Sequence, residues 1–284
     1  MVSTFVEFLI HGVLVGVTYG LLAIPLTLVY TTTDTVDLAV GGYAVLSGAL
    51  ASVVGGVTGV LVGLGAGVLA AATVGTLFVI LARAGAPDPV TVVLATFGFS
   101  IALASVVLWS MGSDPFVARV FTEFWQVGTI RVSPQGAINL GLAVGMLVGL
   151  LLLLYRTSLG RAMRASAVNA VGAGLAGIPV RRVQFLTFVS GGLMAAAAGV
   201  LVLYTTGMDY TSVLQLGLLA IGSALVFGMR PMRAFAGGIA IGVVEALAGG
   251  YISGGWSAAI PLLFILVMLA SGRLGRLSAA EVRP

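Results

Sequence analysis

The chain has 284 residues, of which 60% are hydrophobic and only 8% are charged, and its mean hydropathy is +1.18. A soluble domain carries about 25% charged residues, so this composition excludes a water-soluble globule. The uncharged run Leu38–Ala82 alone covers 45 residues, which is enough for two bilayer crossings of about 20 residues each. The polar stretches between apolar runs are too short to fold alone, and we therefore expect residues 1–284 to form one multi-pass membrane domain.

Missing residue types exclude several kinds of chemistry. The chain has no cysteine, a single histidine (His11) and no lysine, since all 13 basic residues are arginine. Thiolate chemistry, histidine metal clusters and a Walker A nucleotide-binding loop, which needs a lysine, are thereby excluded. We expect no catalytic residue, no metal and no cofactor. We also expect no nucleic-acid partner, because the arginines lie beside apolar spans, as membrane topology requires.

Apolar runs between charges and turn residues predict an all-α fold, a transmembrane bundle of about nine helices. The expected crossings, in chain order, are Phe8–Tyr30, Leu38–Gly56, Thr58–Ala82, Val90–Met111, Gln135–Tyr155, Gln184–Thr205, Ser212–Met229, Ala234–Ile252 and Trp256–Gly272. Placing Arg83 in the cytoplasm puts 11 of the 13 arginines on that side and leaves only Arg119 and Arg131 outside. This distribution follows the positive-inside rule. The orientation of the N-terminus stays open.

A polar segment, TTTDTVD at residues 31–37, interrupts the apolar pattern. It is either a turn between helices or a break within one helix, near residues 31–42, at membrane depth; such a break is tolerated only where protein or a water-filled cavity surrounds it. In the second case Asp34, Asp37, Gly41 and Gly42 are candidates for the translocation path, because a charge at membrane depth faces a cavity or a partner. In the first case the aspartates are ordinary helix caps.

Glu245 lies inside the expected crossing Ala234–Ile252 and is flanked by apolar residues. A carboxylate in this position is expected to face the bundle interior. Two roles stay open: a structural hydrogen bond, or a place on the translocation path.

Glycines recur at every fourth position in three segments: Gly12, Gly16 and Gly20; Gly59, Gly63 and Gly67; Gly141, Gly145 and Gly149. Small residues at this spacing allow two helix backbones to approach closely in a membrane. We expect all three stripes to serve helix packing.

The segment Arg156–Val183, RTSLGRAMRASAVNAVGAGLAGIPVRRV, is the longest loop between two well-defined spans, with five arginines and no acidic residue. Asn169 is positioned to cap a short helix, Gly177 to end it, and Pro179 to block its continuation. Such a loop either contacts anionic headgroups or presents short helices to a partner.

This segment, together with GGIAIGVVEALAGGY and the closing SGRLGR, resembles permease subunits of branched-chain amino-acid ABC importers, a superfamily shared with ribose-type sugar permeases. The resemblance implies a bacterial importer subunit in the inner membrane that moves a small solute, with a branched-chain or related amino acid favoured. The implied partners are ABC ATPase subunits, a second permease (a homologue or a copy of this chain), a solute-binding protein and the bilayer. It also implies that residues 156–183 form the ATPase-coupling loop. The coupling residues are Leu159, Gly160, Arg161, Arg164, Asn169, Ala173, Gly177 and Ile178.

Two departures from the family pattern leave alternatives open. The segment Asp37-Leu38-Ala39-Val40-Gly41 is closer to that of ribose-type permeases, and a double-glycine loop is reduced to Gly228-Met229-Arg230-Pro231. One alternative is therefore a ribose-like sugar or nucleoside ABC permease. The other is an ion-coupled secondary carrier that uses Glu245 and Asp37.

The outer loop Gly112–Pro134 is the expected contact for the binding protein. Its polar and aromatic residues are Asp114, Arg119, Glu123, Phe124, Trp125 and Arg131. The aromatic residues suit the membrane interface equally well.

Overall fold

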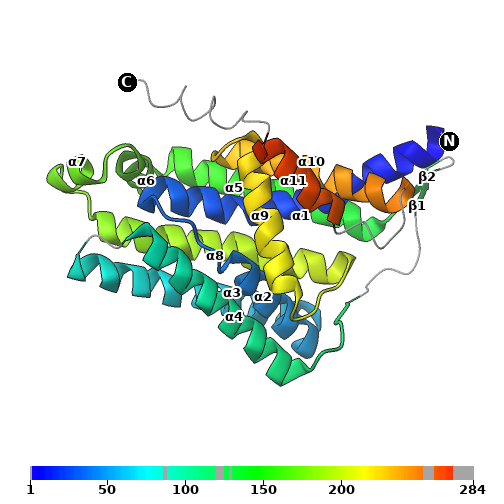
Figure 1. Cartoon of the computed structure of the whole chain (residues 1–284), viewed down its shortest axis with the longest axis horizontal. Coiled ribbons are helices and arrows are strands. Elements are labelled where there is room, and N and C mark those ends of the chain that lie inside the picture. Colours follow the sequence, from blue (N-terminus) through cyan, green and yellow to red (C-terminus); the bar gives the residue numbers. More distant parts are fainter. Residues whose placement is uncertain (1, 86–87, 119–124, 128–129, 252–258, 271–284) are drawn as a thin grey trace.

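A computed structural model describes residues 2–85, 88–118, 125–127, 130–251 and 259–270. These residues form eleven helices and one short β-hairpin (Figure 1). The elements are α1 (Val2–Thr33), α2 (Val40–Val54), α3 (Gly56–Ala84), α4 (Pro89–Met111), β1 (Trp125–Val127), β2 (Ile130–Val132), α5 (Pro134–Arg156), α6 (Ser158–Val168), α7 (Ala170–Leu175), α8 (Val180–Thr205), α9 (Ser212–Phe227), α10 (Pro231–Tyr251) and α11 (Ala259–Ala270).

The prediction of an all-α membrane bundle is confirmed apart from the hairpin, but the count of about nine helices is not. Two of the eleven helices, α6 and α7, lie within the segment predicted as a loop. Six helices in the described residues are long and apolar enough to cross a membrane: α1, α3, α4, α5, α8 and α10. The apolar helices α2 and α9 are shorter, with 15 and 16 residues. Residues 34–39 break the chain before α2, and loops precede and follow α9. The chain is a multi-pass membrane protein.

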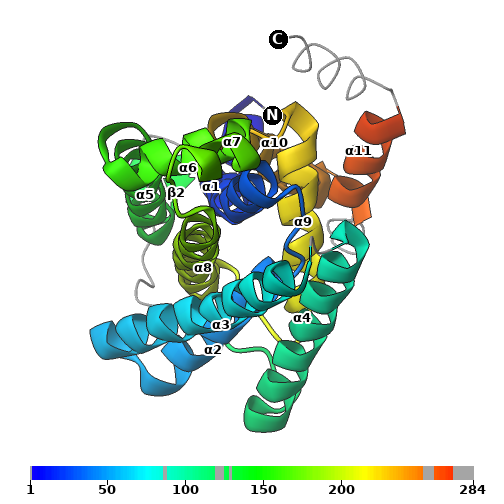
Figure 2. The same cartoon turned by 90° about the vertical axis from the view of Figure 1, so that its left-hand side faces the viewer.

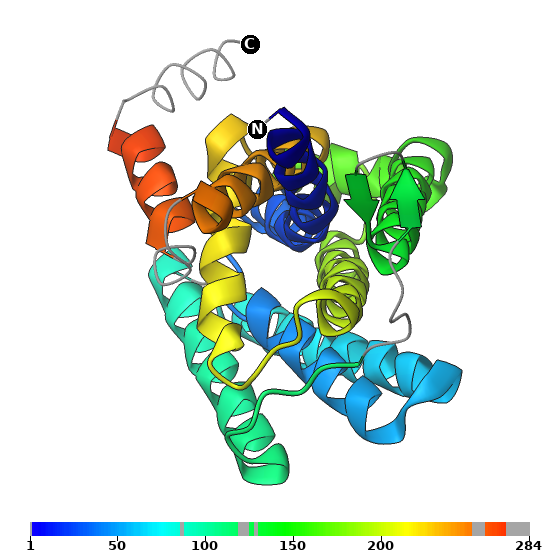
Figure 3. The same ribbon diagram turned by 90° about the vertical axis from the view of Figure 1, so that its right-hand side faces the viewer.

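Helix α1 lies at the centre of the molecule. Figure 2 shows it almost end-on, surrounded by α5, α8, α9 and α10, while α2, α3 and α4 lie beyond α8 and α9. The view from the opposite end agrees (Figure 3). Helices α4 and α5, by contrast, leave most of their apolar surface exposed, as expected for helices that face lipid.

Glycines bring α1 and α10 into backbone contact. A Cβ atom added at Gly12 would lie 2.6 Å from the Val243 Cα, and one added at Gly16 would lie 2.6 Å from the Ile239 Cα. The second predicted stripe is also buried: Gly63 faces the backbone of α2, and Gly67 faces Ala196 on α8. The third stripe is different, because nothing lies within 4 Å of a Cβ added at Gly141, Gly145 or Gly149.

A sharp turn joins α2 to α3. Gly55 and Gly56 have φ values of 71° and 59°, a left-handed conformation that glycine adopts without steric cost. The chain therefore reverses after only 15 residues of α2, and α3 returns beside it toward Arg83.

Arginines gather at the end of the bundle where α3 stops and where α6, α7 and α8 begin. Arg83, Arg181 and Arg182 line one cavity of about 420 Å³ there, and an Arg181 Nη2 donates to the Ala82 carbonyl at 3.5 Å. Arg164, Arg230 and Arg233 line another cavity. We call this the arginine-rich end.

Candidate functional site

The segment after α5 folds into two short helices whose boundaries follow the predicted breaks. The Thr157 hydroxyl caps α6 by accepting from the Gly160 N–H at 3.0 Å, and the Asn169 Oδ1 caps α7 by accepting from the Gly172 N–H at 2.8 Å. Gly177, at φ 84°, ends α7, and Pro179 precedes α8. The predictions that Asn169 caps this short helix, that Gly177 ends it and that Pro179 separates it from the next helix are confirmed.

Gly160 lies where α6 turns back against α5. A Cβ atom at this position would overlap the carbonyl oxygens of Leu153 and Leu154. Glycine at residue 160 is thus required for the turn itself, which sets the direction of α6.

The eight residues predicted to couple to an ATPase divide into three groups. Leu159, Ala173 and Ile178 pack toward the body of the protein. Gly160, Asn169 and Gly177 shape the backbone, as described above. Arg161 and Arg164 are exposed on α6, and the Arg164 guanidinium lies over the Tyr155 ring, 4.8 Å from its centroid.

Three further residues of this segment are exposed, although the sequence did not single them out. Val168, Val171 and Leu175 are 89%, 76% and 87% exposed, and together we call them the apolar ridge. Because α6 and α7 are not among the helices that are long and apolar enough to cross a membrane, exposed apolar side chains on them are typical of a surface that a partner covers. The sequence offers only their spacing of three and four residues as a signal. In a chain that is 60% hydrophobic this spacing occurs in most segments and does not distinguish an exposed surface.

The polar segment is a break inside the protein. Helix α1 continues through Thr33, and residues 34–39 then lead to α2. Thr35, Asp37 and Ala39 are no more than 2% exposed, and the Leu38 N–H donates to the Thr96 Oγ1 on α4 at 3.1 Å. Of the two alternatives left open by the sequence, the structure therefore favours the break over a loop in water.

Asp37 is fully engaged within this break. Its Oδ1 accepts from the Ala39 N–H at 2.9 Å, and its Oδ2 accepts from the Tyr43 hydroxyl at 3.0 Å. Tyr43 is itself 1% exposed. Both carboxylate oxygens thus hold the start of α2 in place, although the N-cap residue of that helix is Ala39 and not Asp37.

Asp34 is separated from Asp37. It is exposed, has a φ of 54° and lies at the arginine-rich end. The preceding threonines each donate a hydroxyl back to a carbonyl of α1, for example Thr33 to Val29 at 2.7 Å. These bonds satisfy the polar side chains at the end of α1, which continues beyond Tyr30 to Thr33.

Gly41 and Gly42 allow neighbouring helices to approach α2. A Cβ atom at Gly41 would overlap the Val213 carbonyl at the start of α9, and one at Gly42 would lie 2.9 Å from the Leu103 Cδ1 on α4. The two glycines therefore fit a packing role around the break.

Glu245 lies on α10 and interacts with the side chain of Tyr19 on α1. Its Oε2 is buried and has no hydrogen-bond partner among the described residues. Asp37 and Glu245 therefore have different partners on different helices, and the structure does not bring them together as a pair.

The opposite end of the molecule carries the expected outer loop. Phe116 and Met208 exchange backbone hydrogen bonds of 2.9 and 3.0 Å, which tie the loop after α4 to the loop after α8. Asp114 is exposed. Arg119, Glu123 and Phe124 lie outside the described residues, and only the backbone of Trp125 and Arg131, in the hairpin, is described.

Asp209 holds the start of α9 at this end. Partial burial favours a higher pKa, but hydrogen bonds from Thr211 and Ser212 outweigh it and lower the pKa of the Asp209 carboxyl. The carboxylate therefore stays ionised at neutral pH and keeps these three bonds, including that from the Ser212 hydroxyl at 2.9 Å.

A multi-pass helical bundle with a buried break between α1 and α2, and with two short capped helices at its arginine-rich end, is typical of a membrane transport protein. The family described as branched-chain amino acid transport system / permease component matches residues 8–270, and the chain belongs to this family.

Two curated relatives align along the whole chain. The high-affinity branched-chain amino acid transport system permease protein LivH of Escherichia coli (strain K12) is 28% identical, over 98% of each chain. The corresponding protein BraD of Pseudomonas aeruginosa is 26% identical, also over 98% of each chain. Among solved structures, PsaBC from Streptococcus pneumoniae in complex with Fab is similar in fold, with a TM-score of 0.53 and 15% identity over 94% of this chain and 95% of that one.

Proposed function

We propose that this chain is the membrane-spanning permease subunit of an ABC importer in the cytoplasmic membrane, and that it moves a branched-chain or related amino acid inward. The family match over residues 8–270 carries the proposal. The names of the full-length relatives support the amino acid as solute. The engagement of both Asp37 oxygens within the protein weakens the case for a sugar-binding carboxylate there.

ATP hydrolysis belongs to a separate ATPase in this proposal, and α6 and α7 form its docking site. The support is the apolar ridge, whose three side chains are exposed, and Gly174 beside it lines a cavity together with Arg83, Arg181 and Arg182. That end is cytoplasmic because arginines concentrate there. A second permease subunit in the membrane completes the transporter, together with a solute-binding protein that docks at the end opposite the arginines.

Introducing a charge into the apolar ridge tests the docking site. We expect Val171→Asp and Leu175→Asp each to reduce co-purification of the ATPase at least tenfold and to abolish uptake, because a carboxylate would have to be desolvated in the interface. The folded yield should not change, since both side chains are exposed.

Val57→Asp is the matched control for these variants. Val57 is 78% exposed near the start of α3, at the opposite end from Arg83. It should leave ATPase binding unchanged. Normal ATPase association and uptake in both ridge variants would remove this segment from the coupling interface.

Glu245→Gln separates the proposed importer from an ion-coupled carrier. The amide keeps hydrogen-bonding capacity and deletes the titrating charge, so the importer should retain uptake within about twofold of the unsubstituted chain. A carrier that protonates Glu245 should lose the pH dependence of its uptake. Uptake measured from pH 5.5 to 8 in both forms, with and without ATP, decides between them.

A further inference from the structure

Two adjoining cavities lie between α1 and α6 at the arginine-rich end. The larger has a volume of about 470 Å³ and the smaller about 290 Å³, and they share the wall formed by Thr31, Thr32 and Ala167. Together they reach the size of ordinary small-molecule sites. Of the apolar ridge only Val168 lines one of these cavities, namely the smaller.

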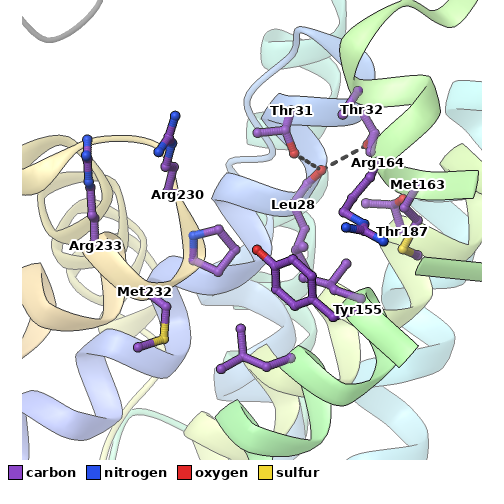
Figure 4. Close-up of a pocket in the computed structure, with 14 residues that line it drawn as sticks. Leu28, Thr31, Thr32, Tyr155, Met163, Arg164, Thr187, Arg230, Met232 and Arg233 are labelled. Atoms are coloured by element: carbon purple, nitrogen blue, oxygen red, sulfur yellow. Dashed lines mark hydrogen bonds between the residues drawn. The ribbon is translucent and has the colours of Figure 1, made fainter. Parts of the chain in front are cut away.

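The larger cavity combines positive charge with an apolar wall. Figure 4 shows Arg164 on one side of it and Arg230 and Arg233 on the other. Three leucines contribute to its apolar wall, namely Leu28, Leu151 and Leu154. Because the Arg164 guanidinium stacks on Tyr155, its orientation is fixed and its N–H edges can donate to a carboxylate. None of the described residues that line this cavity is acidic.

The smaller cavity has the opposite electrostatic character. Asp34 lines it, and so do the last residues of α1, whose carbonyl end carries the negative end of the helix dipole. Ser166 also lines it. The Ser166 side chain is 3% exposed, and its hydroxyl has no hydrogen-bond partner within the part of the chain that the structure describes. A buried hydroxyl without a partner is costly unless a ligand or water completes it.

We propose that these two cavities form one binding site for a free α-amino acid with an apolar side chain, reached from the cytoplasm. The carboxylate faces Arg164, and the ammonium group faces Asp34, the end of α1 and the Ser166 hydroxyl. Both charged groups are attached to one carbon atom, which lies where the cavities adjoin, beside Thr31 and Thr32. The side chain packs on the leucines of the larger cavity. This inference rests on the proposed function for its choice of solute. It adds a binding site on the cytoplasmic side of the protein, in which residues of α6 form part of the wall.

The test uses the purified full-length chain in nanodiscs and isothermal titration with L-leucine, 4-methylpentanoate and 3-methylbutylamine. The second compound lacks the ammonium group and the third lacks the carboxylate. We expect L-leucine to bind at least tenfold more tightly than either analogue, because each analogue leaves one charged wall unpaired. Equal binding of L-leucine and 4-methylpentanoate would overturn the zwitterion site.

Two variants locate the binding. Arg164→Gln and Asp34→Asn should each weaken L-leucine binding at least tenfold, and asparagine is compatible with the positive φ of residue 34. The control Arg182→Gln, at the same end but lining a separate cavity, should bind normally. Unchanged L-leucine binding in both test variants would overturn the proposal, and if the same variants lose ATPase co-purification, the arginines instead bind an acidic group of the ATPase.

Uptake separates the failure of this inference from the failure of the proposed function. If the complete transporter imports leucine but the test variants bind it normally, only the inner site is wrong. If the complete transporter does not import branched-chain amino acids at all, the proposed function is wrong.

Discussion

Replacing Asp37 with alanine is expected to lower the free energy of unfolding by about 2 to 5 kcal/mol, because it leaves two buried groups without a partner. These groups are the Tyr43 hydroxyl and the Ala39 N–H, both of which donate to the Asp37 carboxylate. Neither group can reach water, since residues 37, 39 and 43 are at most 2% exposed. The measurements are thermal unfolding in detergent and the yield of folded protein.

Asp37→Asn and Tyr43→Phe sharpen this prediction. The asparagine carbonyl can still accept from the Ala39 N–H, so we expect a smaller loss, about 1 to 2 kcal/mol. Tyr43→Phe removes the second donor and should also cost less than Asp37→Ala. If Asp37 instead contacts the solute, Asp37→Asn should fold in normal yield but lose uptake per folded molecule, which would contradict a purely structural role of Asp37.

Local signals made the helix boundaries within residues 156–183 predictable. Asn169, Gly177 and Pro179 act through the backbone of their immediate neighbours, so their effect on α7 and α8 can be deduced from the sequence. The apolar ridge could not be deduced in this way. In a chain that is 60% hydrophobic, the side chains of Val168 and Leu175 do not stand out until the fold leaves them exposed.

The break at residues 34–39 shows the opposite limit of sequence reasoning. Its polar character is evident from the sequence, but its burial depends on Tyr43, six residues away, and on Thr96 of α4. The threonines before it bond to carbonyls of α1 and extend that helix to Thr33. The role of Asp37 therefore could not be deduced from its immediate neighbours, because it depends on a partner, Tyr43, that only the fold brings into contact.

The three glycine stripes look alike in the sequence, yet the structure separates them. Gly242, although outside the predicted stripes, faces the backbone of Gly16, and a Cβ atom there would lie 2.6 Å from the Gly12 carbonyl oxygen. Gly145 lies on the exposed face of α5 with nothing within 4 Å. Only tertiary contacts distinguish a glycine that packs from one that faces lipid.

The same substitution at these two glycines should accordingly have opposite outcomes. We expect Gly242→Leu to separate α10 from α1 and to cost more than about 3 kcal/mol, because the side chain would have to displace helix backbone and not a flexible side chain. Gly145→Leu should leave the isolated chain folded, with a melting temperature unchanged within error, since the leucine extends into open space. Thermal unfolding and gel-filtration profiles of the two variants in the same detergent measure the difference. Equal destabilisation by both substitutions would contradict the packing of α1 on α10 through its glycines.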